Sequence, residues 1–479
     1  MKRSKSEQKQ GRIISSLGIF YSMNEIKEKI YSSLSAMEAE NKKKIASLQK
    51  RALLTAYAHL VRTAEYGKVW TEALRAALRE NEIVEIPTGR EPYYIDDTVV
   101  IPSNRRIEAW RAVLCLAPGC RVLMFRNEHT QDGTKAPIDV SSRNCNISIS
   151  GGCFAESRTE REGYGKSGRY SENEEFFGVS ACMLFNNIES LTLENVTFRN
   201  TAGFAVQIGD AKNCIFENIW FNNCFADGLH VNGGSENIVA RHVYGEVGDD
   251  LVALNAYDWQ NSSVNFGAIK NVLCEHLNLA PLSRYKALRF EPGIYTYADG
   301  SVVDCALENV IIKDVIGIKT FKMYLQTPPY AIGGEREKGA PGTVDNFFFE
   351  NISADLHTPI DPFPEYVKGD RVRGVFAAFE LGANIGTVTF ENVDFTHHGE
   401  EFPLSYLVCI GPKSIVSGGK EFFDPYISCR AERLIFKNIS VNGEKAKDIR
   451  PLLREVNFDD VNGDGESSGN GKIFEVIYE

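Results

Sequence analysis

Two short segments of the chain carry acidic residues directly before a strand-like run. The first, ADGLHVN at 226–232, contains Asp227, and the second, GDDLVALN at 248–255, contains Asp249 and Asp250. If these segments are neighbouring strands of one stack, Asp249 lies about 4.8 Å from Asp227. Three carboxyl groups this close repel one another, so the pKa of at least one should rise. One protonated and one ionised carboxyl group are what hydrolysis of a glycosidic bond requires.

A structural interpretation of the same residues is available, because Asp-Gly and Gly-Asp-Asp are also ordinary turn sequences. For either motif alone, a turn is the more typical explanation. The two motifs lie one coil apart, and each precedes an apolar strand, so their combination favours a catalytic role over a simple turn.

A repeated phrase indicates which elements position these acids. Glu or Lys is followed by Asn, then Ile or Val, any residue and an apolar residue, and weaker copies have His in place of Asn. Asn tolerates the left-handed turn conformation and can bond to the Asn of the next coil. A β-rich repeat of this length indicates stacked coils with a shared core, and long helices between the strands are missing. We therefore expect a right-handed parallel β-helix. The central repeat positions are 195, 218, 242, 276, 309, 351, 392 and 438.

Alternation along the strands predicts which side chains face outward around the acids. We align Leu229 with Leu251 and Val231 with Ala253 as inward pairs, and extend this register to Phe204 one coil earlier. Lys286 and then Lys319 continue the column of the acids. The outward positions are then Ala205, His230, Val252, Arg289 and Lys322 in one column, and Gln207, Asn232, Leu254, Glu291 and Tyr324 in the other.

The N-terminal part has a different pattern. Apolar residues recur at helical spacing over 22–64, so we expect a helical extension at 1–64 and a catalytic β-helix at 65–479. The extension is interpreted either as an arm that forms a homo-oligomer or as a helix packed on, or capping, the main body. A second short helix is expected over 69–79.

Composition narrows the partners. The net charge of −11 argues against a protein that binds nucleic acid. The sequence contains no run of 18 consecutive apolar residues, so we expect no membrane-spanning segment. Eleven cysteines, without a CxxC pair, are interpreted as buried free thiols rather than as a zinc site or disulfides. Without a clear secretion signal, we expect a cytoplasmic protein.

The paired motifs resemble glycoside hydrolase family 28, the polygalacturonases and their relatives. ADG followed by GDD, with SNR at 103–105 and NISISGG at 146–152 before them, occurs in the order typical of that family. The resemblance covers roughly residues 60 to 445. It implies an inverting hydrolase of pectic substrates on a right-handed β-helix, with no metal and no cofactor needed.

By this resemblance, Asp249 is the general acid, and Asp227 and Asp250 hold and activate water. Substrate-side positions depart from the family pattern: Phe225 replaces an Asn, Lys286 replaces a His, and Lys322-Met323-Tyr324 replaces Arg-Ile-Lys. We expect a uronate-containing or related oligosaccharide, cut by exo-type release. The residues predicted to bind this oligosaccharide are Gln207, His230, Asn232, Lys286, Arg289, Glu291, Lys322 and Tyr324.

Two other functions remain open. A β-helix polysaccharide lyase or epimerase would use Lys or Arg as base, and a non-catalytic carbohydrate-binding β-helix would explain the changed positions. DVNGDG at 460–465 matches half of a calcium loop but has Gly471 at its last ligand position, so a surface turn is the better interpretation. Segments 327–334 and 361–366 are expected in long loops that either line a sugar cleft or pack on the body.

Overall fold

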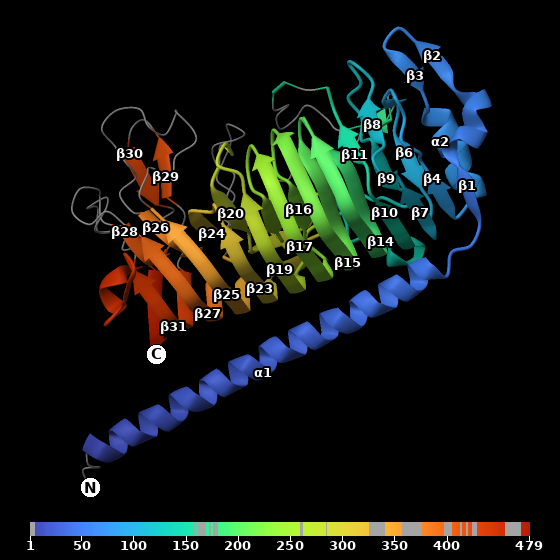
Figure 1. The fold of residues 1–479 in the computed structure, drawn as a ribbon. Helices are drawn as coiled ribbons and strands as arrows, with labels where there is room; N and C mark the ends of the chain where they lie inside the picture. Colours follow the sequence, from blue (N-terminus) through green and yellow to red (C-terminus); the bar gives the residue numbers. More distant parts are fainter. Residues whose placement is uncertain are drawn as a thin grey trace.

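The expected right-handed parallel β-helix is confirmed, with one long helix along its side (Figure 1). The computed structural model describes residues 5–157, 159–160, 169–171, 174–175, 181–258, 262–283, 285–324, 341–356, 376–396, 405–411, 414–417, 420–423, 429–455 and 471–479. The predicted loop segments 327–334 and 361–366 and the DVNGDG turn lie outside these residues.

Each coil has three faces, which we name from the coil of β15 (Phe204–Cys224): sheet 1 at 204–209, sheet 2 at 211–217 and sheet 3 at 219–222. In later coils sheet 1 becomes a separate short strand. The strands of sheet 1 are β16 (Leu229–Asn232), β18 (Val252–Asn255), β20 (Ala287–Phe290), β24 (Thr320–Tyr324), β26 (Phe376–Gly382), β28 (Ser405–Ile410) and β33 (Leu453–Glu455). Sheets 2 and 3 share β14 (Ala181–Arg199), β17 (Glu236–Val247), β19 (Ile269–Leu279), β23 (Leu307–Ile316), β25 (Thr343–Asp355), β27 (Asn384–Thr396), β31 (Cys429–Val441) and β34 (Gly471–Tyr478).

A short helix closes the N-terminal end of the stack. The expected helix over 69–79 is found as α2 (Thr71–Glu80), which buries Ala73, Leu74 and Leu78. It packs on the first coils (Figure 1). These contain β1 (Arg51–Leu53), β2 (Arg62–Ala64), β3 (Gly67–Val69), β4 (Ile83–Glu85), β5 (Tyr93–Ile95), β6 (Val99–Ile101), β7 (Arg105–Glu108), β8 (Val113–Leu116), β9 (Phe125–Asn127), β10 (Asn144–Ser150) and β11 (Cys153–Ala155).

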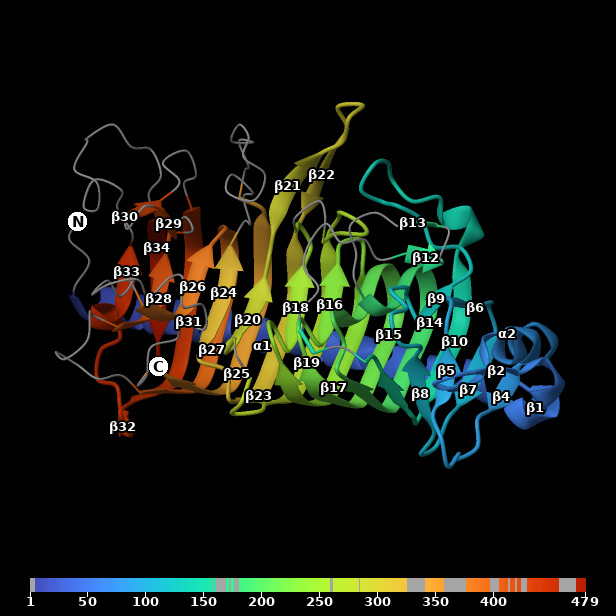
Figure 2. The ribbon, with the colours of Figure 1, turned by 90° about the horizontal axis from the view of Figure 1, so that it is seen from above.

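Smaller elements decorate the stack, and the hairpin of β21 and β22 projects beyond sheet 1 when the molecule is seen from above (Figure 2). These elements are β12 (Arg169–Ser171), β13 (Glu174–Glu175), β21 (Gly293–Thr296), β22 (Val302–Cys305), β29 (Ser414–Ser417), β30 (Lys420–Phe423), β32 (Glu444–Lys445) and the 3-10 turns Leu54–Leu60, Val140–Ser142 and Arg450–Leu452.

The predicted Asn turns exist, but they form two ladders rather than one. At the turn from sheet 2 to sheet 3, Asn218 donates to Asn195 at 2.7 Å. Asn309, which the sequence placed in this ladder, belongs to a second one at the start of sheet 2, where it donates to Asn271 at 3.1 Å. The first ladder instead continues through His276 and Asp314, because Glu275 pairs with Lys313. Each of these turn residues has a positive φ near 55°, which Asn tolerates better than most residues.

The N-terminal helix α1 (Lys5–Ala46) lies against the outer face of sheet 2 (Figure 1). It ends at Ala46, so the expected helical region over 22–64 is too long, and 51–53 already pair with 83–85 in the solenoid. Apolar residues of the helix, including Ile30 and Leu34, pack on an outward apolar column of the sheet. Lys27 adds ion pairs with Glu350 and Glu391, at 2.5 and 3.2 Å.

The cysteines agree with their predicted state. All eleven carry free thiols, and nine of them are buried. Among the described residues, no helix has the length and hydropathy needed to cross a membrane.

Candidate active site

The three acids lie in the turns that lead from sheet 3 into sheet 1 of two successive coils. The register differs from the predicted one by one residue, because Leu229 pairs with Val252 rather than with Leu251. Asp227 therefore stands beside Asp250, and the Asp250 amide donates to Asp227 Oδ1 at 3.1 Å. Asp249 directly precedes Asp250 in the chain and lies in the same turn.

The same correction changes the columns nearby. His230 pairs with Gln207 and Ala253, so Ala253 faces outward and Leu254 inward, the reverse of the prediction. Phe204, expected inward, lies outside the main core in a cluster with Leu184 and Val264. A one-residue slip exchanges the two faces of a strand, which is why one misaligned pair altered both Ala253 and Leu254. Phe204 is not part of this slip, since Val206 in its strand pairs with Leu229 and both lie in the main core.

The predicted acids form one compact and buried group. One oxygen of each of Asp227, Asp249 and Asp250 lies within 4.8 Å of the others. Their exposed fractions are 3%, 4% and 0%. Arg289 reaches them from the next coil, with its guanidinium 3.2 Å from Asp249 Oδ1 and 3.2 Å from Asp250 Oδ2. The three carboxyl groups are close enough to hold a cation, and the guanidinium of Arg289 supplies positive charge at that place.

The environments of the acids are unequal. Burial raises the pKa of Asp250 well above its usual range; Arg289 opposes this, and the neighbouring charges of Asp249 and Asp227 add to it. Asp227 lies against a different group, the imidazole of His230, whose Nδ1 is 2.6 Å from Asp227 Oδ2. The cluster therefore contains at least one carboxyl group that holds its proton more tightly than an exposed Asp does.

His230 is clamped between two carboxylates. Its Nδ1 lies 2.6 Å from Asp227 Oδ2 and its Nε2 lies 3.1 Å from Asp258 Oδ2. Burial alone would lower the pKa of His230, but the hydrogen bonds and charges of both partners raise it to about 9. Phe204 stacks on the imidazole with ring centroids 4.0 Å apart. His230 is therefore a charged and rigid support for Asp227 at neutral pH.

Gln207 and Asn232, predicted to contact sugar, are fully buried and hold a loop over sheet 1. Gln207 donates to the Ser262 carbonyl at 2.7 Å and to Asn232 Oδ1 at 2.7 Å. Asn232 Oδ1 also accepts from the Val264 amide at 3.2 Å. These side chains are thus used inside the protein, where they fix the segment around 262–265.

The predicted basic group is only partly assembled. Arg289 and Lys322 are register partners, and both lie over the ring of Tyr285, at 5.4 and 5.1 Å from its centroid. Glu291 is fully buried, 3.7 Å from Arg289 Nε. Lys286 instead donates to the Pro281 carbonyl at 2.6 Å. Tyr324 ends β24, and its side chain lies outside the described residues.

Three residues of the site were missed by the sequence prediction. Asp258 completes the clamp on His230, Asn255 orients Asp258 with a 3.0 Å hydrogen bond, and Tyr285 supports Arg289 and Lys322. Asn255 and Asp258 follow the strand of GDDLVALN directly, so a prediction that continued past the strand end would have included them. Tyr285 has no comparable signal, because its position depends on the path of the loop before β20.

Comparisons with known proteins give a fold but no sequence family. No model of a protein family matches the chain, and no curated protein does. Among solved structures, a hyperthermoactive exopolygalacturonase from Thermotoga maritima aligns with a TM-score of 0.52 and 10% identity, over 92% of this chain and 96% of that one. A family 28 exopolygalacturonase from Yersinia enterocolitica aligns with a TM-score of 0.48 and 13% identity, over 90% and 78%. The surface adhesin PfbA of Streptococcus pneumoniae gives 0.41 and 12%, over 90% and 91%. The resemblance to family 28 is thus confirmed at the level of the fold.

Proposed function

We propose that the chain is an inverting glycoside hydrolase acting on a uronate-containing oligosaccharide. The observation that carries this proposal is the buried cluster of Asp227, Asp249 and Asp250 at one edge of sheet 1, with unequal environments. Carboxyl groups are rarely buried together without a function, because each loses its hydration on folding. Acid–base hydrolysis is the chemistry that such a group serves best.

In the proposed mechanism, Asp249 donates a proton to the leaving oxygen, and Asp227 and Asp250 hold the attacking water. His230 keeps Asp227 oriented through the 2.6 Å contact to Oδ2. Lys322, buried beside Tyr285, is proposed to meet the uronate carboxylate. A cytoplasmic enzyme of this kind would act by exo-type release on short imported oligosaccharides.

The closeness of the three acids makes the stereochemical course a sharp test. Most inverting enzymes keep about 6.5–9.5 Å between the two carboxyl groups, whereas the oxygens here lie within 4.8 Å. We therefore propose that Asp227 and Asp250, side by side, share the water. NMR of the first product formed from a uronate oligosaccharide should show an inverted anomer. A retained anomer would reject inversion while supporting hydrolysis.

Activity itself is tested with Asp249→Asn and the matched variant Asp304→Asn, which changes an exposed acid in the projecting hairpin. Loss of general acid catalysis should lower kcat by about 10²–10⁴-fold. Reducing ends released from pectic oligosaccharides measure this rate. Full activity of Asp249→Asn would reject the proposed site, and ultraviolet-absorbing unsaturated products would indicate a lyase instead.

One observation favours a second candidate, a non-catalytic carbohydrate-binding β-helix. Arg289 contacts Asp249 and Asp250 and lies close to Glu291, so much of the acidic charge is already compensated inside the protein. Such a protein would bind a sugar without cleaving it. Sugar binding with no turnover across a broad panel of oligosaccharides would select this function.

A further inference from the structure

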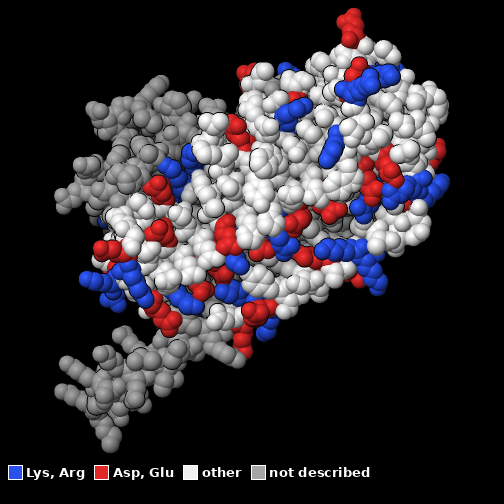
Figure 3. Space-filling model, in the orientation of Figure 1, with Lys and Arg blue, Asp and Glu red and all other residues white. Residues whose placement is uncertain are grey.

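Sheet 3 presents a column of outward side chains on the strands that precede the turns carrying the acids. Trp220, Tyr244, Asn278 and Ile316 are register partners in four successive coils. Trp220 is 52% exposed and Ile316 is 62% exposed. Exposed large apolar side chains in a row are uncommon on a protein surface and often mark a binding site. The face shown in Figure 3 has a largely uncharged area above a band of mixed charges.

Three residues of this column, Tyr244, Asn278 and Ile316, line a surface pocket of about 610 Å³, and Trp220 precedes them in the column. The size lies in the range of small-molecule sites. Aromatic, amide, hydroxyl and imidazole groups line it together, which gives both flat apolar surface and hydrogen-bonding groups. These groups belong to Tyr244, Asn278, Ser353, His242 and His276, and Asp314 adds a carboxyl group.

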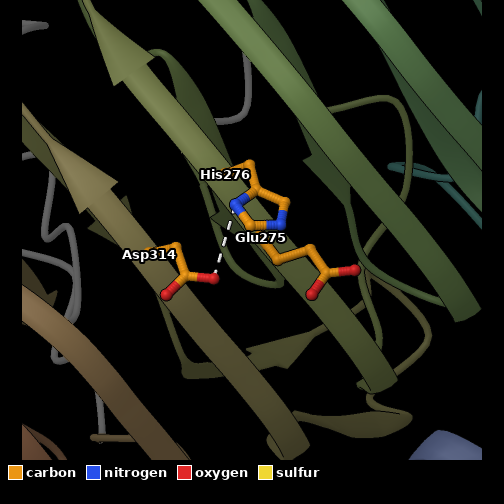
Figure 4. Close-up of side chains that lie close together, drawn as sticks. All are labelled: Glu275, His276 and Asp314. Carbon is orange, nitrogen blue, oxygen red and sulfur yellow. Dashed lines mark ion pairs between the residues drawn. The ribbon is translucent and has the colours of Figure 1, made fainter.

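The charged groups beside the pocket are satisfied by one another. Figure 4 shows His276 between Glu275 and Asp314, with His276 Nδ1 3.4 Å from Asp314 Oδ2. Glu275 accepts from Arg241 Nε at 2.5 Å, and Asn351 donates to Asp314 Oδ1 at 2.6 Å. Neither Lys nor Arg is among the described residues that line the pocket. A metal ion would have to compete with Arg241, and an anionic ligand would meet carboxylates.

The aromatic side chains are held in a fixed arrangement. The Trp220 and Tyr244 rings lie 5.8 Å apart at an angle of 50°. The Tyr244 hydroxyl is 3.0 Å from His242 Nδ1, and His242 stacks on His276 with centroids 4.7 Å apart. Rigid aromatic groups lose little conformational entropy when a ligand binds. They provide apolar faces on which a sugar ring can stack.

We infer that this column binds a neutral carbohydrate chain, at a site separate from the acids. Pyranose rings would stack on Trp220 and Tyr244, and hydroxyl groups would meet Asn278 and Ser353 within the pocket. Successive coils place the four residues of the column about 4.8 Å apart along the axis, so a polymer lying along the axis meets one of them at each coil. Neutral sugar fits because this wall combines apolar faces with uncharged polar groups, and its charges are already paired. The inference goes beyond the proposed hydrolysis and does not depend on it.

Affinity electrophoresis of the full chain in gels containing β-glucan, galactan or galactomannan tests the inference. Migration should be retarded in at least one of these three gels. Retardation in a gel that contains polygalacturonan, which is charged, should not be stronger than in that neutral gel. Trp220→Ala and Asn278→Ala should each weaken the retarding affinity, by at least tenfold for Trp220→Ala. Trp110→Ala is the matched control, since Trp110 is 54% exposed elsewhere, and should bind as the unchanged chain does.

Three results would overturn the inference. One is migration without retardation in all three neutral gels. Another is retardation that Trp220→Ala and Asn278→Ala leave intact while circular dichroism shows folded protein. The third is a dimer, seen by sedimentation equilibrium, that Trp220→Ala converts into monomers, since the column would then bind a second copy of the chain. None of these results bears on the activity assay of Asp249→Asn, so the two proposals fail independently.

Discussion

Sheets 1 and 2 each carry an outward column that is buried, but the two columns have opposite chemistry. On sheet 2, Val239, Leu273 and Ile311 are apolar and lie under α1. On sheet 1, His230, Arg289 and Lys322 are charged, and His230 and Lys322 are almost fully buried. Covering the apolar column stabilises the fold, whereas burying the charged one costs desolvation that pairing only partly offsets. We infer that the first column serves stability and the second serves chemistry.

The sharpest way to break this comparison is Asp250→Asn. The variant should lose about 10²–10⁴-fold in kcat, because an amide in place of the Asp250 carboxyl group cannot exchange a proton with the water. Its fold should nevertheless gain stability relative to the unchanged chain as the pH rises. The raised pKa of Asp250 means that the folded state holds this proton more tightly than the unfolded state, so stability is lost above about pH 4, the usual pKa of Asp.

Urea unfolding at pH 5, 6, 7 and 8 measures this gain, and product release from pectic oligosaccharides measures the loss of activity. The free energy of unfolding of Asp250→Asn should fall less steeply with pH than that of the unchanged chain. Equal slopes would mean that the folded state does not hold a proton on Asp250, and the contrast between the two columns would lose its main support.

The apolar column is tested by Leu34→Ala in α1. Leu34 is 2% exposed within the cluster that joins the helix to sheet 2, so the truncation should cost about 2–5 kcal/mol of unfolding free energy. Activity per folded molecule should not change, because this cluster contains none of the predicted site residues whose side chains the structure describes. Ser33→Ala, at an exposed position one residue earlier, is the control for helix propensity. A Leu34→Ala protein with normal stability would show that α1 is not docked as described.

The two columns also differ in how far the sequence predicts them. The Asn turns and the apolar alternation predicted the β-helix, and the Asp motifs predicted a cluster that the structure does bring together. The register failed at Leu229, because both Leu251 and Val252 are apolar and the alternation accepts either partner. The placement of α1 on sheet 2 was not predictable in detail, since an amphipathic stripe does not specify which surface it covers. Asp258 was missed because its partner His230 comes from the preceding coil.

The smallest expected effect concerns the clamp on His230. Because its pKa is raised to about 9, this group contributes stability that is fully present below pH 6.5 and is lost as the pH rises toward 9. Asp258→Asn removes one of the two carboxylates that hold the proton, so the loss should still begin near pH 6.5 but be smaller and end at lower pH. Weaker orientation of Asp227 should lower kcat about fivefold, which corresponds to about 1 kcal/mol, with little change in KM. NMR titration of the His230 imidazole and the pH profile of kcat measure the two effects, with Asp304→Asn as control. If the His230 pKa stays near 9 in Asp258→Asn, Asp227 alone holds the proton. The proposal that both carboxylates, Asp227 and Asp258, keep His230 charged would then be wrong.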